Sequence, residues 1–267
     1  MAAVATSEDQ GKVTLYWLSQ SRSQRIVWLL EELGVPYDLE IFHRTKARLA
    51  PPELEKIHPL GKSPVISVLP PGPDAKPIVI AESGAMTEYL VDHYGKGKNL
   101  EPKRWRDGME GKVGGETEAW MRYRYYMHYA EGSLMPNLVM GLVIGTLKST
   151  TVPFFIRPIT TVVANKIIAQ FLLPTAKKHL AFLNEQLATS GGRYLCSDEL
   201  TAADILMSFP LIAASGRWND MGDFEGGSWD KAYPKVKEYV DLLQQNEGYK
   251  RSIAKIEEVD GKFSPSL

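Results

Sequence analysis

Two short stretches of the sequence carry polar groups at spacings that suit the binding of a small peptide. In the first, Glu82 and Ser83 stand between an extended apolar run, residues 77–81, and a predicted helix over 83–94. This arrangement offers a carboxylate, a hydroxyl and helix-start N–H groups, and a helix N-terminus favours an anion. The stretch therefore predicts a site for the amine and the carboxylate at one end of a peptide.

The second stretch, residues 58–66, places a lysine and a proline directly before a predicted strand. Lys62 offers a cation for a second carboxylate, and Ser63 offers exposed main chain beside Pro64, whose ring restrains the backbone. Together the two stretches can hold a peptide by its amine, its backbone and its carboxylates. Each also has a simpler explanation, because Ser83 can be an ordinary helix cap and Lys62 a solvated lysine.

The elements that must position these residues form a predicted βαβ unit followed by a hairpin and a helix. Strands are predicted over 12–18 and 35–42, with a helix over 25–33 that Gly34 ends. Strands joined through a helix in this way run parallel. The rest of this half is predicted to comprise a short helix, two strands around a proline-rich turn, and a helix, at residues 50–57, 65–69, 78–81 and 83–94.

Strand signals vanish beyond Glu110, and helical periodicity takes over. The fold class is therefore predicted as an α/β thioredoxin-like N-terminal domain plus an all-α C-terminal helical domain. Thr201 and Asp204 fit a helix-capping box in the second half. The predicted helical stretches are 113–147, 158–189, 202–214 and 232–245, and the predicted divisions are a flexible tail (1–10), the α/β domain (11–95), a linker (96–112) and the helical domain (113–267).

Composition narrows the function classes. The chain is 44% hydrophobic and 24% charged, which is usual for a soluble globular protein. A net charge of −1 gives no general electrostatic case for a nucleic-acid partner. The only cysteine, Cys196, excludes a disulfide framework and a cysteine-built metal site, so no metal is expected. One cysteine and no signal-like N-terminus fit a cytoplasmic protein.

The apolar stretch over 138–173 raises the question of a membrane. Lys148, Arg157 and Lys166 interrupt it, so no uninterrupted run approaches the roughly 18 residues of a spanning helix. A buried helix pair is the first expectation. Peripheral contact with a bilayer is the alternative.

Four stretches in order, residues 21–25, 58–64, 82–83 and 200–205, resemble the cytosolic glutathione S-transferase superfamily. Residues 21–33, 129–134 and 203–210 are most similar to its theta-like fungal and bacterial branch. The resemblance spans Lys12 to about Tyr249. It implies glutathione as co-substrate in the N-terminal domain, a pocket for hydrophobic electrophiles in the helical domain, and a homodimer.

The resemblance implies that Ser21 donates the hydrogen bond that stabilises the glutathione thiolate. Ser21 lies just after the first predicted strand and just before the first helix, where an O–H can point at a sulfur. Ser19 and Ser23 compete for this role, and Tyr16 is a further candidate because some classes use a tyrosine there. An ordinary N-cap serine is the simpler explanation.

The same resemblance assigns the glutathione-binding residues. Lys62 is expected at the glycyl carboxylate, with Arg44 and Lys46 as weaker helpers, while His58 braces the loop. The remaining assignments are Ser63 for main-chain pairing with the cysteinyl unit, Pro64 in a cis peptide, Glu82 at the ammonium and Ser83 at the γ-glutamyl carboxylate.

The pocket for the second substrate is expected near Tyr126 and Tyr129, which share one face of an aromatic-rich helix. A core role for both rings is the simpler explanation. The loop that holds Ser21 contains no cysteine, which disfavours disulfide reduction. Conjugation of glutathione to hydrophobic electrophiles is the expected activity; the alternatives are a glutathione-dependent peroxidase or a non-catalytic carrier or regulator of hydrophobic ligands.

Overall fold

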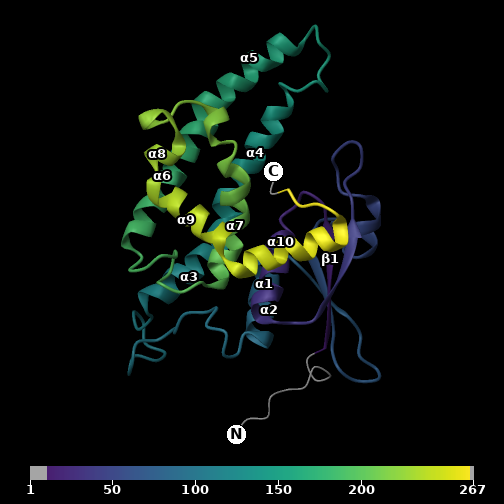
Figure 1. Cartoon of the computed structure of the whole chain (residues 1–267), viewed down its shortest axis with the longest axis vertical. Coiled ribbons are helices and arrows are strands. Elements are labelled where there is room, and N and C mark those ends of the chain that lie inside the picture. The colour runs from purple at the N-terminus through teal and green to yellow at the C-terminus, as the bar shows by residue number, and fades with distance from the viewer. Residues whose placement is uncertain (1–10, 265–267) are drawn as a thin grey trace. The chain divides into compact units, whose positions relative to one another are not determined.

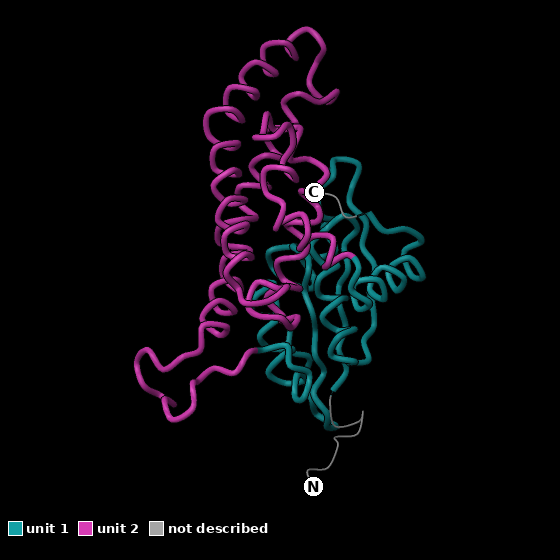
Figure 2. The backbone as a smooth tube through the Cα atoms, turned by 60° about the vertical axis from the view of Figure 1, so that its left-hand side comes forward, with its two compact units in different colours: residues 1–101, 245–266 teal, residues 102–244, 267 magenta. Residues whose placement is uncertain are grey.

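The computed structural model describes residues 11–264, which form two compact units (Figure 2). Unit 1 comprises residues 11–101 and 245–264, and unit 2 comprises residues 102–244. The predicted tail over residues 1–10 lies outside the described part of the chain.

A four-stranded mixed sheet forms the centre of unit 1. Its strands are β1 (Lys12–Leu18), β2 (Tyr37–Phe42), β3 (Val65–Leu69) and β4 (Ile78–Ala81), in the order β2-β1-β3-β4. β1 runs parallel to β2 and antiparallel to β3, which in turn runs antiparallel to β4. The parallel pair and the hairpin confirm the predicted α/β half of the fold.

Two helices of unit 1 begin close to the candidate site. They are α1 (Gln24–Leu33) and α2 (Ser83–Tyr94), and a short 3-10 turn, η2 (Pro52–Lys56), stands where a short helix was expected. Gly34 ends α1 with a φ of 69°, a conformation that glycine adopts without steric cost, and its N–H donates to Leu30 O at 2.9 Å.

A further helix, α10 (Glu247–Asp260), completes unit 1 and was not predicted. The Asn246 side chain starts it by accepting from Gly248 N–H at 2.8 Å. Tyr249 then packs edge-on against Trp28 of α1 with ring centroids 5.3 Å apart. Figure 1 shows α10 beside α1. Helix α10 therefore belongs to unit 1, whereas the sequence analysis assigned residues 247–260 to the helical domain.

Unit 2 is helical apart from an isolated bridge between Trp105 and Glu116 in its described residues. This confirms the predicted all-α half. The core helix α7 is buried along residues 202–214. The elements are α3 (Glu118–Tyr129), η3 (Ala130–Leu134), α4 (Met135–Thr146), α5 (Arg157–Ile167), η4 (Ile168–Leu172), α6 (Leu173–Thr189), α7 (Ala202–Ser215), η5 (Trp218–Met221), η6 (Glu225–Gly227), α8 (Trp229–Ala232) and α9 (Pro234–Gln245).

The predicted capping box starts α7. The Asp204 carboxylate accepts from Thr201 N–H at 2.9 Å and from the Thr201 hydroxyl at 2.6 Å. Leu195 N–H at 3.0 Å and the Tyr239 hydroxyl at 2.7 Å also donate to it. Asp204 is fully buried, so these four donors replace the water that the carboxylate loses on folding.

The apolar stretch over 138–173 differs from the buried helix pair that was expected. Ala164, Ile168 and Leu172 are buried and four residues apart, so one face of the continuous helix α5–η4 packs inward. Its other face is exposed. Within residues 11–264 one helix, Arg157–Thr189, is long and apolar enough to cross a membrane, by length and composition only.

Candidate active site

Three serine hydroxyls form a continuous hydrogen-bonded chain beside the start of α1. Ser21 Oγ lies 2.7 Å from Ser23 Oγ, which lies 2.7 Å from Ser63 Oγ. Ser63 Oγ donates to the main-chain oxygen of Tyr16 at 3.0 Å. The chain thus joins the loop after β1 to the loop before β3, two segments far apart in the sequence.

The direction of the hydrogen bonds follows from the number of protons. Each serine hydroxyl has one proton to donate. Ser63 gives its proton to the Tyr16 carbonyl, so Ser23 must donate to Ser63 and Ser21 must donate to Ser23. Ser21 is therefore the end of the chain, and its hydroxyl is the one that can redirect its proton without breaking the bonds behind it.

Burial distinguishes Ser21 from Ser23, while Ser19 is more exposed than either. Ser23 is 0% exposed, whereas Ser21 retains 7%. Ser19 accepts from Arg44 N–H at 3.4 Å, and its own N–H donates to Phe42 O. Tyr16 directs its hydroxyl to Ser67 Oγ at 3.2 Å. Of the two neighbouring serines, Ser21 is the more exposed, and its role as the activating donor stays a prediction.

Basic side chains gather at the loop that carries Ser21, and this was only partly predicted. Arg44 donates to Gln20 O at 2.9 Å and to Arg48 O at 3.1 Å, so it braces the loop. Burial, and then the charges of Arg48 and Arg22, lower the pKa of Arg44. Because three guanidinium groups lie close together, this loop favours a bound anion.

The loop before β3 has the backbone form expected of it. The Ser63–Pro64 peptide is cis. Lys62 is exposed and Pro64 is buried. His58 accepts from Leu60 N–H through Nδ1 at 3.4 Å, in keeping with the expected bracing role.

Glu82 and Ser83 form a strained junction between β4 and α2. Glu82 has φ 69° and ψ 119°, a backbone conformation that non-glycine residues rarely adopt. It is exposed, and its carbonyl accepts from Met86 N–H at 2.9 Å. Such strain persists where surrounding structure holds it, and it gathers at ligand sites.

A buried arginine lies behind this junction, and sequence reasoning missed it. Arg25 of α1 is 0% exposed, and its Nη2 donates to Ser83 Oγ at 2.9 Å. A charge is costly to bury unless it makes hydrogen bonds. Arg25 directly precedes the apolar run Ile26–Leu30 and looked like an ordinary polar residue at a helix start, so only the fold reveals that its side chain reaches α2.

The two tyrosines expected at the second-substrate pocket both lie in the interior of unit 2. Tyr126 is 0% exposed, and its ring lies at 89° to that of Tyr129 with centroids 6.1 Å apart. Tyr129 is hydrogen-bonded to His179 Nδ1. Burial raises the pKa of both phenols and lowers the pKa of His179.

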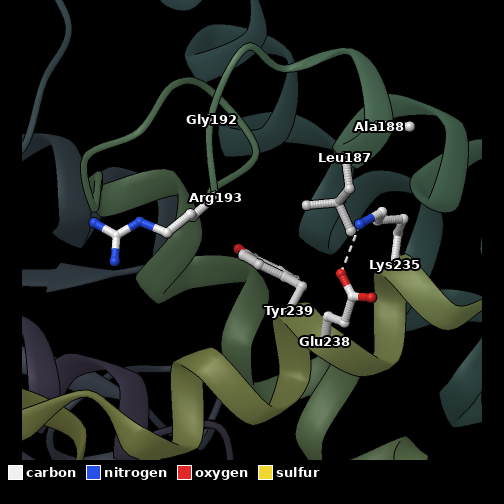
Figure 3. Close-up of a pocket in the computed structure, with 7 residues that line it drawn as sticks. All are labelled: Leu187, Ala188, Gly192, Arg193, Lys235, Glu238 and Tyr239. Atoms are coloured by element: carbon white, nitrogen blue, oxygen red, sulfur yellow. Dashed lines mark hydrogen bonds and ion pairs between the residues drawn. The ribbon is translucent and has the colours of Figure 1, made fainter.

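Unit 2 also has a pocket of about 290 Å³ (Figure 3). The charged side chains that line it form ion pairs within the protein: Lys235 pairs with Glu238 at 2.7 Å, and Arg193 pairs with Asp198 at 3.0 Å. Tyr239 directs its hydroxyl to Asp204. None of the predicted site residues lines this pocket, which is formed by Leu187, Ala188, Gly192, Arg193, Lys235, Glu238 and Tyr239. Over the described residues, no cluster of side chains could hold a metal ion.

Comparison with known proteins places these features in a family. Residues 21–93 match the family model "Glutathione S-transferase, N-terminal domain", and residues 167–242 match "Glutathione S-transferase, C-terminal domain". The chain is 30% identical to glutathione S-transferase 1 of Saccharomyces cerevisiae over 94% of its length and 98% of the relative's. It is 32% identical to glutathione S-transferase 3 of Schizosaccharomyces pombe over 92% of its length and 88% of the relative's.

Solved structures agree with the fold. A glutathione S-transferase from Actinobacillus pleuropneumoniae superposes with a TM-score of 0.65 at 27% identity and covers 95% of each chain. A glutathione transferase family member from Pseudomonas fluorescens, solved with two glutathione bound, gives a TM-score of 0.60 at 22% identity over 93% of this chain and 94% of that one. On the two domain models and the two yeast relatives, the chain belongs to the glutathione S-transferase family.

Proposed function

We propose that this protein is a glutathione transferase in which Ser21 activates the thiol of glutathione for addition to hydrophobic electrophiles. The observation that carries the proposal is the position of Ser21 at the donor end of the Ser21–Ser23–Ser63 chain, directly before α1. Membership of the family supports the choice of glutathione as co-substrate, and so does the glutathione-bound Pseudomonas relative.

The chemistry requires a thiolate at neutral pH. A free thiol of this kind has a pKa of about 8.5, so only a few per cent is ionised. A hydroxyl donor and the N-terminus of a helix both favour the charged sulfur. We propose that Ser21 turns its proton from Ser23 to the sulfur, while Arg22, Arg44 and Arg48 add positive potential at the same loop.

The rest of the proposed site holds the ends of the tripeptide. Ser83, with Arg25 behind it, would receive the γ-glutamyl carboxylate, and Glu82 would face the ammonium. Ser63 would pair its main chain with the cysteinyl unit beside the cis peptide. Lys62 would meet the glycyl carboxylate.

The second substrate is proposed to be apolar, as expected of the aromatic cluster of Tyr125, Tyr126, Tyr129 and Phe182 in unit 2. Tyr126 and Tyr129 belong to this cluster, but their burial gives them a supporting role behind any pocket wall. We further propose that the protein acts in the cytoplasm as a homodimer, as the family resemblance implies, and the theta-like branch stays a prediction.

Turnover assays test the proposal. Purified protein with glutathione is offered an aryl halide, an isothiocyanate and an organic hydroperoxide, and glutathione binding is measured by calorimetry. Conjugation of either electrophile supports the transferase. Turnover of the hydroperoxide alone would assign a peroxidase, and binding without any turnover would assign a carrier.

A further inference from the structure

Helix α5 and the loop before it form one end of unit 2 (Figures 1 and 2). This end exposes large apolar side chains. Phe154 is 80% exposed and Phe155 is 69% exposed, and their rings pack edge-on at 5.6 Å. A single exposed apolar residue needs no explanation, but a group of them marks an interaction site. We call this group the apolar tip; its members are Phe154, Phe155, Ile156, Ile159, Val162 and Val163.

The apolar tip has the regularity of one helix face. Ile159, Val162 and Val163 are spaced three and four residues apart, so they lie together along α5. Ala164 and Ile168 occupy the opposite face and are buried in unit 2. The helix is therefore apolar on both faces, and only one of them is covered by the protein. Polar residues would be expected on a face meant for water alone.

The charged residues of the surrounding segment indicate which kind of partner the apolar tip can bind. From Gly132 to Asn184 the sequence contains no aspartate or glutamate, although the whole chain has a net charge of −1. The same segment carries five basic residues: Lys148, Arg157 and Lys166 lie on α5 or in the loop before it, and Lys177 and Lys178 lie in α6. Lys166 is exposed on α5 directly after the apolar stripe. A sequence segment that combines exposed apolar side chains with basic ones and contains no acidic residue complements the surface of an anionic lipid bilayer.

The connection of α5 to the rest of unit 2 shows whether the helix can cross a membrane or only lie on its surface. The helix continues through η4 into α6, whose Leu180, Leu183 and Leu187 are buried in unit 2. The exposed part, residues 157–171, is about 22 Å long at 1.5 Å per residue, short of the roughly 30 Å hydrocarbon core. The helix can thus lay its side chains into the interface but cannot span the bilayer while α6 stays packed.

A second copy of the chain fits the tip less well. Two copies joined through this surface would bring basic segments together without an acidic partner on either, and like charges at an interface are unfavourable. We propose that the apolar tip is a membrane-docking surface that inserts Phe154, Phe155 and the exposed face of α5 into anionic lipid. This proposal does not depend on the catalytic role of Ser21.

Vesicle flotation tests the proposal with the full-length protein. The probes are phosphatidylcholine vesicles with and without phosphatidylserine. The wild type is expected to float with the anionic vesicles and to be released by high salt. Phe154→Ser with Phe155→Ser is expected to weaken binding at least about tenfold, and Lys166→Glu about tenfold.

Matched substitutions elsewhere serve as controls. Val162→Ser on the tip is expected to weaken flotation, and it is compared with Val113→Ser, because Val113 is also exposed but lies outside the apolar tip. Lys166→Glu is compared with Lys76→Glu, an exposed lysine of unit 1. The controls are expected to float like the wild type, and the unfolding midpoint of each variant shows that it is folded.

Three outcomes would overturn the proposal. One is a wild type that does not float with anionic vesicles. Another is equal flotation of the wild type and the Phe154→Ser/Phe155→Ser variant. The third is a doubling of mass in solution that the same tip substitutions abolish without any lipid binding, which would assign the surface to a second copy.

Discussion

The guanidinium of Arg25 and the hydroxyl of Ser83 join the first helix of unit 1 to the second through a buried hydrogen bond of 2.9 Å. Arg25 lies two residues after Ser23, the middle of the hydroxyl chain, and Ser83 is the first residue of α2. One buried charge therefore links the predicted thiol end of the site to its predicted γ-glutamyl end.

Replacing Arg25 should weaken glutathione binding. Arg25→Met removes a hydrogen bond from a charged donor, worth about 1.5–3 kcal/mol, so the dissociation constant should rise roughly tenfold to hundredfold. Arg25→Lys should recover part of the loss because it keeps the charge. Calorimetry on the folded variants measures this.

Arg251→Met is the matched control, since Arg251 of α10 is half exposed and pairs with Glu31 and Glu32. Its dissociation constant should equal that of the wild type. If Arg25→Met also bound glutathione normally, the link between the two helices would have no role in the site.

The close approach of α10 to α1 depends on the absence of a side chain at Gly248. A Cβ there would lie 1.6 Å from Glu32 Oε1 and 2.7 Å from Trp28 Nε1. Gly248→Ala must displace Glu32 and break its 3.1 Å hydrogen bond with Trp28. A loss of about 2–3 kcal/mol in unfolding free energy is expected from denaturant titration.

Gly145→Ala is the control for this substitution, because a Cβ there would meet nothing within 4 Å. It should be neutral or stabilise α4 by up to about 1 kcal/mol. Equal midpoints for Gly248→Ala and the wild type would show that α10 does not pack on α1 as described.

The half-buried His179, hydrogen-bonded to the buried Tyr129, should make stability sensitive to acid. The pKa of His179 is lowered from its ordinary value of 6.5 by burial, so the folded state binds its proton less readily than the unfolded state. Stability is then complete above pH 6.5 and falls as the pH drops below that value. Thermal unfolding from pH 7.5 to pH 5 (about one unit or more on each side of 6.5) measures the loss.

His179→Asn supplies the comparison, because asparagine does not titrate in this range. Its unfolding temperature should fall less than that of the wild type over the same acid window. An identical pH dependence for the two proteins would contradict the proposed protonation of His179 on unfolding.

The capping box of α7 should be a main contributor to the stability of unit 2. Asp204→Ala leaves four buried donors without their acceptor, and a loss of about 3–5 kcal/mol is expected. Asp198→Asn, which breaks the exposed pair with Arg193, should give no measurable shift. Comparable losses of unfolding free energy from both substitutions would show that the buried network contributes no more to stability than the exposed ion pair.

The sheet of unit 1 was predictable because its strands have clear signals in the local sequence. β1, β3 and β4 occupy the predicted residues 12–18, 65–69 and 78–81, where β-branched residues run between turn signals. Helix α10 was missed, although Asn246 and Gly261 are its caps. Its buried residues Tyr249 and Ser252 are explained only by their contacts with Trp28 and Gln24 of α1, which the sequence does not show. Packing between distant segments leaves no local signal.

The candidate site likewise has features with a local sequence signal and features that depend on the packing of distant segments. The sequence predicted Ser21 after the first strand, Ser63 before a later strand and Ser83 at a helix start, and the elements begin and end accordingly, because motif spacing and capping chemistry are local. It could not rank Ser21 above Ser23, since the difference lies in burial and in the direction of shared protons. Nor could it show that Arg25 reaches Ser83, which depends on how α1 and α2 lie in unit 1.

The central claim is that the hydroxyl of Ser21 stabilises the glutathione thiolate. Its most direct test is the pKa of the thiol in bound glutathione, followed through the ultraviolet absorbance of the thiolate in the wild type, Ser21→Ala and Ser23→Ala. We expect a pKa well below about 8.5 in the wild type and in Ser23→Ala, and a rise of about one unit or more in Ser21→Ala with a matching loss of conjugation rate. A low thiol pKa retained in Ser21→Ala but lost in Ser23→Ala would contradict the account.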